Sequence, residues 1–370
     1  MIKNLFKNID FILLICIIAL SIIGIVGIYS AGYSSDVNRD EYIKQLIFFG
    51  IGMLVMIALI VIPSSIIEIS GYLIYIVNLV LLVAVLFTAK LMGANSWFNL
   101  GGILYQPSEL MKIGYILSFA KVLSIYKKQS GMNKTKRVIC GIIMFSLFVF
   151  PVTLILLQPD FGTAVVFLII TLFMLFKSGL KYRYILIGIA ILLICMPLAY
   201  YFVLNDVQRA RIDVYLDPTL DPLGSGYNAI QSQLAVGSGM LIGTGLLKGV
   251  QTQLGYIPIK TSDFIFSVLS EELGFVMSFT IIVLFVIMII RLIIDSKNTF
   301  DEYYSLVAIG ITGMIFFHFV QNIGMTIGFL PITGVPLPFV SYGGSSMLTN
   351  CFAMGIIFNI CARRKKSFLF

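Results

Sequence analysis

The residue of this chain best placed to do chemistry is an aspartate at the point where a long polar segment gives way to apolar sequence. Asp263 lies in the segment TSDFIF (261–266), directly ahead of a stretch rich in aliphatic and aromatic residues. A carboxylate at a water–lipid boundary can act as a general base, which accelerates a reaction by about 10²–10⁴-fold. It can also cap the helix that follows, because the positive end of a helix favours a carboxylate. The position of Asp263 leaves both roles open.

Two glutamates follow in the same apolar stretch. On a helix, Glu271 lies about 80° around the axis from Asp263 and so near the same face, whereas Glu272 points roughly the opposite way. Both are candidates for a substrate cavity, and the alternative is an interfacial position without a role in chemistry.

A second polar group opens an apolar stretch in the segment QPSELMK (106–112). An ionisable group near the bilayer centre costs about 2.5–3.5 kcal/mol, so such groups usually face a cavity or a partner. Glu109 and Lys112 are spaced i,i+3 and can neutralise each other at a helix start. They can instead line a polar cavity together with Gln106, and the spacing does not decide between the two.

The remaining polar residues in apolar surroundings favour structural roles. Asp160 lies in a tight turn, where we expect it to be solvated or to cap the next helix. His318 is the only histidine, and we expect it to form an interhelical hydrogen bond because no ligand-spaced partner accompanies it. No convincing Ser/His/Asp set is present, so covalent acyl chemistry is not indicated.

These residues are embedded in a chain that is 59% apolar and only 11% charged, whereas soluble domains have about 25% charged residues. Apolar stretches of about 20 residues, long enough to cross a hydrocarbon core of roughly 30 Å, recur along the chain. We therefore expect an all-α polytopic membrane protein, a single domain (1–370) with about ten transmembrane helices. The expected spans lie near residues 10–30, 42–62, 71–90, 107–125, 138–157, 161–177, 183–204, 264–290, 303–325 and 341–361.

The net charge of +8 reports topology rather than nucleic-acid binding. Lysine and arginine gather in alternate connections, at 127–137, at 177–183 and in the tail 363–366, whereas the connection 326–340 has none. Because cytoplasmic loops are enriched in these residues, both termini are predicted to be cytoplasmic. The long segment of about 205–262, between spans 7 and 8, is then an extracytoplasmic loop.

The long loop contains five glycines within GSGMLIGTGLLKG (237–249). Their spacing differs from the dinucleotide fingerprint by one residue, and no Ser or Thr follows Lys248 as a Walker A motif requires. We expect these glycines to permit turns and close approach of the backbone to helices or a ligand. A short helix is expected from Tyr227 to Val236.

Four segments together resemble the SEDS family of bacterial shape, elongation, division and sporulation proteins (RodA, FtsW, SpoVE). They are GANSWFNLGGILYQPSELMK (93–112), DPLGSGYNAIQSQLAVGSGMLIGTGLLKG (221–249), TSDFIFSVLSEELGF (261–275) and GFLPITGVPLPFVSYGGSS (328–346). The short tails and the Ser96–Trp97 pair resemble RodA-type members, which serve cell elongation, more than FtsW-type members.

The resemblance implies a ten-span peptidoglycan glycosyltransferase of the bacterial cytoplasmic membrane. Such an enzyme polymerises lipid II into β-1,4 glycan with inversion at the donor anomeric carbon and releases undecaprenyl pyrophosphate. The family's essential loop aspartate falls on Asp263, which would deprotonate the acceptor 4-hydroxyl. Arg211, Lys248 or a divalent cation (Mg²⁺ or Mn²⁺) would supply positive charge to the leaving group, and the metal ligands are unknown. The implied partner is a class B penicillin-binding protein, a transpeptidase.

Further polar residues in or beside these motifs are candidates for binding substrate or lining a cavity. They are Gln106, Glu109, Lys112, Gln231, Ser232, Gln251, Ser262, Glu271, Glu272, Ser341 and Tyr342. Two other functions fit the same composition: a lipid II flippase, whose path would be lined by Glu109, Lys112 and His318, and a non-catalytic scaffold for the transpeptidase. The enzyme is favoured because the best-placed acid lies at the outer mouth rather than at the midplane.

Overall fold

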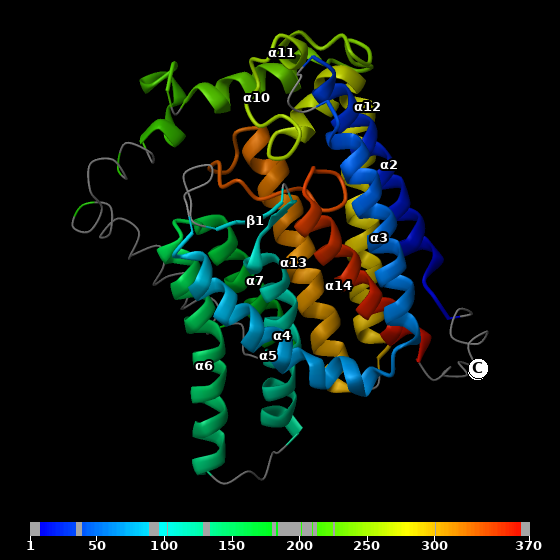
Figure 1. Cartoon of the computed structure of the whole chain (residues 1–370), viewed down its shortest axis with the longest axis vertical. Coiled ribbons are helices and arrows are strands. Elements are labelled where there is room, and N and C mark those ends of the chain that lie inside the picture. The colour runs from blue at the N-terminus through cyan, green and yellow to red at the C-terminus, as the bar shows by residue number, and fades with distance from the viewer. Residues whose placement is uncertain are drawn as a thin grey trace.

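The computed structural model describes residues 8–34, 39–88, 96–101, 103–128, 134–179, 213–224, 226–299 and 301–363, with the single positions 183, 201 and 209. Long helices run side by side as a bundle, and several short elements lie on one end of it (Figure 1). In chain order the elements are α2 (Phe11–Tyr33), α3 (Glu41–Val61), α4 (Ser64–Val85), β1 (Phe98–Leu100), β2 (Ile103–Tyr105), α5 (Pro107–Lys128), α6 (Lys134–Leu157), α7 (Phe161–Lys177), η1 (Pro218–Leu220), α10 (Tyr227–Ser238), α11 (Val250–Gln253), α12 (Ile265–Lys297), α13 (Glu302–Thr326) and α14 (Gly344–Ala362).

The expected polytopic membrane protein is confirmed. Within the described ranges, seven helices are long and apolar enough to cross a membrane, and α7 is a shorter apolar helix of 17 residues. Helix α5 has the length of a span but carries several charges. Those charges are neutralised by ion pairs, among them Lys121 with Glu68 of α4 and Lys127 with Glu302 of α13.

Nine of the ten predicted spans coincide with helices in the described part of the chain, and the tenth, at 183–204, lies outside it except for positions 183 and 201. One boundary differs clearly, since the helix expected from residue 71 begins at Ser64, directly after Pro63. Glu68 interrupts the apolar pattern of this helix, so the apolar stretch alone begins later than the helix does. Its pairing with Lys121 explains why the helix tolerates it.

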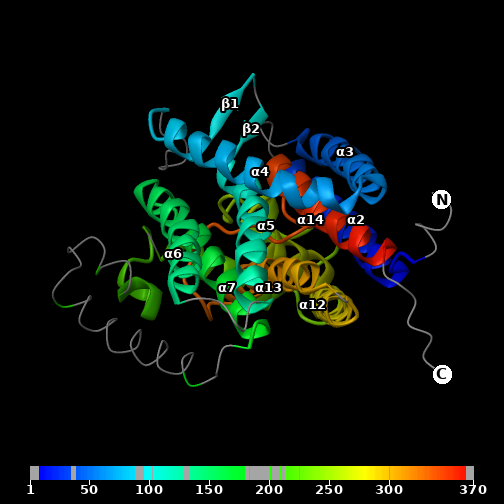
Figure 2. The same cartoon turned by 90° about the horizontal axis from the view of Figure 1, so that it is seen from below.

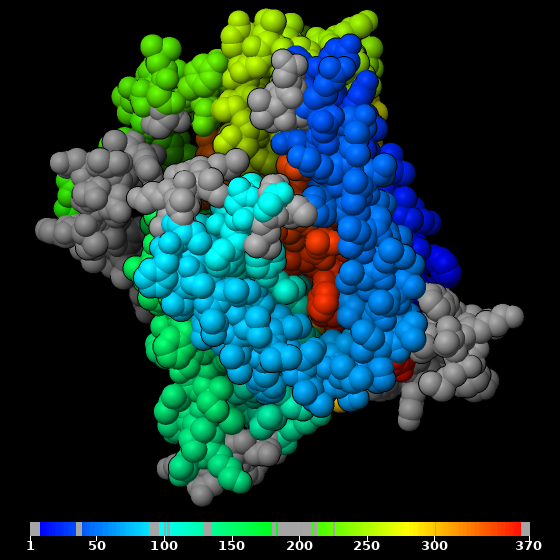
Figure 3. Space-filling model, in the orientation of Figure 1, coloured from blue at the N-terminus to red at the C-terminus, as the bar shows by residue number. Residues whose placement is uncertain are grey.

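Helices α13 and α14 form the interior of the bundle. Helix α13 packs against α5, α7 and α12, and α14 packs against α3 (Figure 2). Small residues permit this packing: a Cβ on Gly355 of α14 would lie 2.7 Å from Leu59 Cδ1 and 3.1 Å from Met56 Cα, so α14 approaches α3 closely. On the face seen in Figure 3, part of α14 is visible in a recess between α3 and α4.

A short antiparallel hairpin is the described departure from an all-helical fold. Strands β1 and β2 pair with Phe98 opposite Tyr105, and Gly101 turns the chain with φ of +64°, which suits glycine. The hairpin is fastened to α14, since Ser345 Oγ donates to Leu104 O at 3.1 Å and accepts from Gln106 N at 3.2 Å. It therefore fixes where α5 begins.

The end of the bundle opposite the short elements is held by two arginines. Asp10 caps α2, and its Oδ2 accepts a hydrogen bond from Arg291 Nε of α12 at 2.6 Å. Arg363 donates to the last carbonyls of α3, at 2.8 Å to Ile62 O and 3.1 Å to Ile60 O. The first pair aligns α2 with α12 at this end.

Candidate active site

Asp263 lies on the turn that leads into α12, and it does not cap that helix. The N-cap residue is Phe264, and no side chain caps the first turn. The Asp263 carboxylate accepts a hydrogen bond from Ser262 Oγ at 3.3 Å. Of the two roles that the sequence left open, helix capping is therefore wrong, and the role of general base stays a prediction.

The surroundings of this half-buried carboxylate tune its basicity. Burial raises the pKa of Asp263 to about 6, against a smaller lowering by the Ser262 hydroxyl, and repulsion from Asp160 adds to the rise. A base with a pKa slightly below neutrality is ionised at pH 7 and still accepts a proton readily.

The backbone of Asp263 is held by a buried amide of α13. Asn322 Nδ2 donates to Asp263 O at 3.0 Å and to Val335 O at 2.9 Å. Gly334 has φ of +66°, and a Cβ there would lie 3.3 Å from Asp263 Oδ2. Asn322 thus joins the segment 261–275 to the segment 328–346. Gly334 lets the segment 328–346 approach the Asp263 carboxylate.

The segment between α13 and α14 is also bonded to the turn before Asp263. Ser341 Oγ donates to Ser262 O at 2.7 Å, and Tyr342 N donates to Thr261 O at 2.9 Å. Gln45 of α3 donates from Nε2 to Ser341 O at 2.9 Å. Three of the candidate residues, Ser262, Ser341 and Tyr342, are therefore brought to Asp263.

A second carboxylate approaches Asp263 from the start of α7. Asp160 caps that helix as expected, accepting from Thr163 N at 3.0 Å and from Thr163 Oγ1 at 2.8 Å. Gln106 Nε2 donates to its Oδ2 at 3.2 Å. Burial raises the pKa of Asp160, the Thr163 hydrogen bonds lower it, and its charge in turn repels that of Asp263.

This repulsion makes a pH-dependent prediction. A general base works only when it is ionised, so with Asp263 in that role activity should fall as the pH drops through about 6, the pKa to which burial raises this carboxyl. In Asp160→Asn the cap is kept but the repulsion is lost, so the acidic limb of kcat/KM against pH should move to lower pH. A limb that stays in place would show that the two carboxylates do not interact.

Glu109 and Lys112 form the expected ion pair. Lys112 Nζ lies 2.8 Å from Glu109 Oε1 and 3.1 Å from Nε2 of His318, and all three side chains are buried. The other ring nitrogen of His318, Nδ1, lies 2.8 Å from Met314 O. Because the ammonium donates to Nε2, Nδ1 carries the proton. The predicted interhelical hydrogen bond of His318 is confirmed, between α13 and α5.

Glu271 and Glu272 hold the long loop. Glu271 accepts from Gln251 N at 2.8 Å, Thr252 N at 3.0 Å and Thr252 Oγ1 at 2.6 Å. Glu272 accepts from Ser30 Oγ of α2 and, at 2.9 Å, from Gln253 Nε2. Both carboxylates are buried and engaged with α11 and α2, which favours a structural role.

Loss of the Glu271 charge should therefore loosen the loop. Hydrogen bonds to a charged group contribute about 1.5–3 kcal/mol, and the amide of Glu271→Gln would place donors against donors. We expect faster amide hydrogen exchange at residues 250–253. Lys248→Gln is the matched control, because Lys248 is an exposed residue of the same loop. It should leave amide hydrogen exchange at residues 250–253 unchanged. Normal exchange with a raised KM in Glu271→Gln would instead assign Glu271 to the substrate site.

The other candidates on the loop make no contact with Asp263 among those described. Ser232 is buried, with its hydroxyl 2.7 Å from Ser267 Oγ and 2.8 Å from Thr326 O, so it packs α10 against α12 and α13. Gln231 is half-buried beside it on α10, and Lys248 is exposed. Gln251 is half-buried and contributes the backbone contact to Glu271. Arg211 lies outside the described residues.

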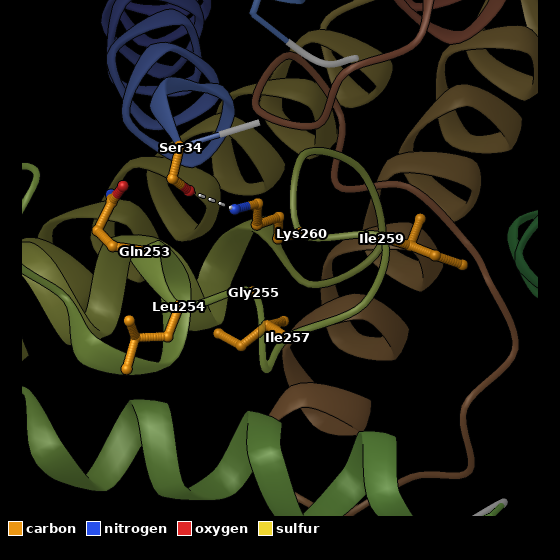
Figure 4. A pocket seen from close by; sticks show the side chains of 7 residues that line it. All are labelled: Ser34, Gln253, Leu254, Gly255, Ile257, Ile259 and Lys260. Carbon is orange, nitrogen blue, oxygen red and sulfur yellow. Dashed lines mark hydrogen bonds between the residues drawn. The ribbon is translucent and has the colours of Figure 1, made fainter. Parts of the chain in front are cut away.

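A surface pocket of about 330 Å³ lies on the loop, close in sequence to the candidate base (Figure 4). Its lining includes Lys260, whose Nζ donates to Thr252 O at 2.8 Å and to Ser34 Oγ at 3.1 Å. Burial lowers the pKa of Lys260, and attraction to Glu272 opposes this. The ammonium thus fastens the loop to the end of α2.

The described residues contain no group of three or more His, Cys, Asp or Glu side chains that could hold a metal ion. Asp160 and Asp263 are, however, two half-buried carboxylates near enough to repel each other. Mg²⁺ is usually held by one or two carboxylates together with water and substrate phosphates. Asp160 can supply one such carboxylate, although its oxygens already accept hydrogen bonds from Thr163 and Gln106.

Three residues beside Asp263 were not predicted from the sequence as part of the site. Asp160 was expected only to be solvated or to cap a helix, and no role was expected for Asn322 or Gly334. The tight turn QPDFGT (158–163) was the signal for Asp160, since it begins a helix at the same end of the bundle as Asp263. For Asn322, the signal was an amide within an apolar helix. Gly334 gave no signal of its approach to the carboxylate.

A model of the cell cycle protein family FtsW/RodA/SpoVE matches residues 10–366. The chain belongs to this family. Among its relatives, peptidoglycan glycosyltransferase MrdB of Escherichia coli K12 is 36% identical over 361 residues, covering 97% of this chain and 95% of the relative. Peptidoglycan glycosyltransferase RodA of Treponema pallidum is 32% identical, covering 97% and 98%. Stage V sporulation protein E of Bacillus subtilis is 36% identical, covering 95% and 96%.

Solved structures from the family share the fold. A chain of a peptidoglycan synthase complex, described as coordinating polymerization and crosslinking, matches with a TM-score of 0.82 and 30% identity over 97% of this chain and 99% of that chain. RodA of Thermus thermophilus, a rod shape determining protein, matches with a TM-score of 0.71 and 26% identity over 97% and 98%. The helical bundle is therefore that of the family.

Proposed function

We propose that this protein is a peptidoglycan glycosyltransferase that polymerises lipid II, with Asp263 as the general base. The observation that carries the proposal is the half-buried Asp263 carboxylate. It does not cap α12, and burial raises its pKa to about 6. The curated names of relatives that match nearly the whole chain support the same activity.

In this reaction Asp263 takes the proton from the 4-hydroxyl of the acceptor sugar. The freed oxygen electrons form a bond to C1 of the donor while the bond from C1 to the pyrophosphate oxygen breaks. The α-linked donor thus becomes a β-1,4 link, and undecaprenyl pyrophosphate leaves with the bonding electrons. Asn322 and Gly334 keep the base in position through the backbone contacts described above.

A divalent cation, Mg²⁺ or Mn²⁺, would be held by Asp160 together with water and the substrate's phosphates, which leaves Asp263 free to accept the proton. The cation would supply positive charge to the departing pyrophosphate, which is a typical contribution of a metal in transfer from a phosphate leaving group. Lys112 is unsuited to this task because Glu109 and His318 already engage it.

We propose that the end of the bundle with Asp263 and the long loop faces outward and that both termini are cytoplasmic. The lysines that end α5 and begin α6 lie at the opposite end, as does the C-terminal end of α14 (Figure 1). This is the distribution that the enrichment of positive residues in cytoplasmic loops favours. A lipid-linked sugar exposed at the outer leaflet would then reach Asp263.

We also propose a crosslinking partner, a class B penicillin-binding protein, and a RodA-type role in cell elongation. The partner is supported by the structural neighbour, a chain of a synthase complex that couples polymerization with crosslinking. The role in cell shape is supported by the relatives named MrdB and RodA.

The two alternatives are less well supported. A flippase needs open polar groups at midplane, yet Glu109, Lys112 and His318 are buried and bonded to one another. A scaffold function gives no reason to keep the Asp263 carboxylate half-buried without a role in capping α12.

An assay with labelled lipid II tests the proposal. Purified protein, alone and with its transpeptidase, should give glycan polymer that is sensitive to lysozyme digestion. Transfer of lipid II between leaflets of proteoliposomes without polymer would establish the flippase, and neither activity under any partner condition would establish the scaffold.

A further inference from the structure

Helix α12 is broken near its outer end, and a loop repairs the break. Gly274 has φ of +74° and ψ of −170°, so the chain of helical hydrogen bonds is interrupted there. Interrupted backbone groups inside a bilayer need partners from elsewhere in the protein. The partners come from the turn formed by residues 239–245.

This turn bonds to both sides of the break. Thr244 N and Gly245 N donate to the carbonyls of Glu271 and Glu272, each at 3.0 Å. In the other direction, Phe275 N donates to Met240 O at 2.8 Å and Val276 N to Leu241 O at 3.2 Å. The 239–245 turn therefore completes the last turn of one helical segment and the first turn of the next.

The glycines of this turn allow its backbone to lie directly on that of α12. A Cβ on Gly239 would lie 1.8 Å from Ser270 O, and one on Gly243 would lie 2.1 Å from Glu272 O. The expected close approach of the glycine run is thus confirmed, and its target is a helix.

The side chains at the tip of the turn are large, apolar and outward-facing. Met240 is 80% exposed, Leu241 68% and Ile242 82%. They adjoin an exposed apolar stripe on α12 that includes Phe275 and Phe279. That stripe belongs to a helix long and apolar enough to span the membrane, so the tip continues a lipid-facing surface.

The height of the turn agrees with burial in lipid. Phe275 and Arg291 are separated by 16 helical residues, which corresponds to roughly 24 Å along α12. Because Arg291 pairs with Asp10 at the far end of the bundle, the turn bonded to Phe275 lies about 24 Å above that end, within the roughly 30 Å of a hydrocarbon core. The chain returns to the bundle end by Leu247, whose N–H donates to Ser30 Oγ at 3.2 Å.

We propose that the 239–245 turn is a re-entrant element whose tip, Met240 to Ile242, inserts among the acyl chains of the leaflet at the loop end of the bundle. It would hold the outer segment of α12, and with it the entry to the Asp263 turn, at a fixed depth in the bilayer. This inference does not rest on the proposed enzymatic function.

Depth-dependent quenching of tryptophan fluorescence tests the proposal on the full chain. Trp97 is the only tryptophan, so Ile242→Trp is made in a Trp97→Phe background and reconstituted in phosphatidylcholine vesicles. Phe279→Trp on the α12 stripe is the lipid-facing control. Val250→Trp, an exposed site on α11 at the far tip of the molecule in Figure 1, is the water-facing control.

Nitroxide-labelled acyl chains should quench Ile242→Trp as strongly as Phe279→Trp and several-fold more than Val250→Trp, while aqueous acrylamide should show the reverse order. Quenching of Ile242→Trp by acrylamide but not by labelled lipid would overturn the insertion. Protection from both quenchers would also overturn the insertion. It would show that the tip contacts protein, which in these vesicles is a second copy of this chain. Leu241→Trp provides a second reading if Ile242→Trp does not fold.

Discussion

Asp263→Asn should lower the rate of lipid II polymerisation by about 10²–10⁴-fold, the contribution typical of a positioned general base. Asparagine keeps the size and the contact with Ser262, but it cannot take up the acceptor proton. Because burial raises the pKa of Asp263, the folded protein holds its charge at a cost, so the neutral variant should be as stable as the wild type at pH 7 or more so. Loss of activity without loss of stability is the expected signature.

Initial rates of glycan formation and thermal unfolding, both in detergent, measure the two properties. Asp217→Asn is the matched control, because Asp217 is an exposed aspartate of the same loop that bonds only locally, with Thr219 at 2.6 Å and 3.0 Å in the described contacts. It should retain full activity. Unchanged polymer from Asp263→Asn would reject the general-base role.

Lys112→Met should destabilise the bundle by about 3–5 kcal/mol, because it leaves the Glu109 charge buried without its partner. Lys112 is only 1% exposed, and its ammonium also bonds His318, so the pair is shielded from solvent. Thermal unfolding in detergent should show a marked drop in melting temperature. Adding Glu109→Gln removes the stranded charge and should restore part of the stability.

A second lysine of α5, paired with a glutamate of α4, gives the control. Lys121 of α5 pairs with Glu68, but both side chains are partly exposed, so Lys121→Met should cost no more than about 1 kcal/mol. Equal losses from the two lysine variants would show that the Glu109 pair is not a buried charge pair in the membrane protein.

Much of the architecture is predictable because a membrane helix satisfies its backbone within its own segment. The apolar stretches therefore located the helices from α2 to α7 and from α12 to α14, and the loop helix α10 was also expected. The errors have local causes: α4 begins early because Glu68 finds a partner in space, and the hairpin β1–β2 is too short for an alternating pattern to reveal it.

The sequence by itself determined that this chain is a polytopic membrane protein of the SEDS type with an acid at the mouth of its long loop. It could not decide whether Asp263 is a cap or a base, because that depends on where one carboxylate finds its hydrogen bonds. The tertiary structure excluded the cap, because Phe264 occupies the N-cap of α12, and it tied the Asp263 backbone to Asn322 on another helix. It also showed that Glu271 and Glu272 accept hydrogen bonds from the long loop. In addition, it placed Asp160 where its charge repels that of Asp263. Such assignments join residues far apart in the chain, and spacing along one helix carries no information about them.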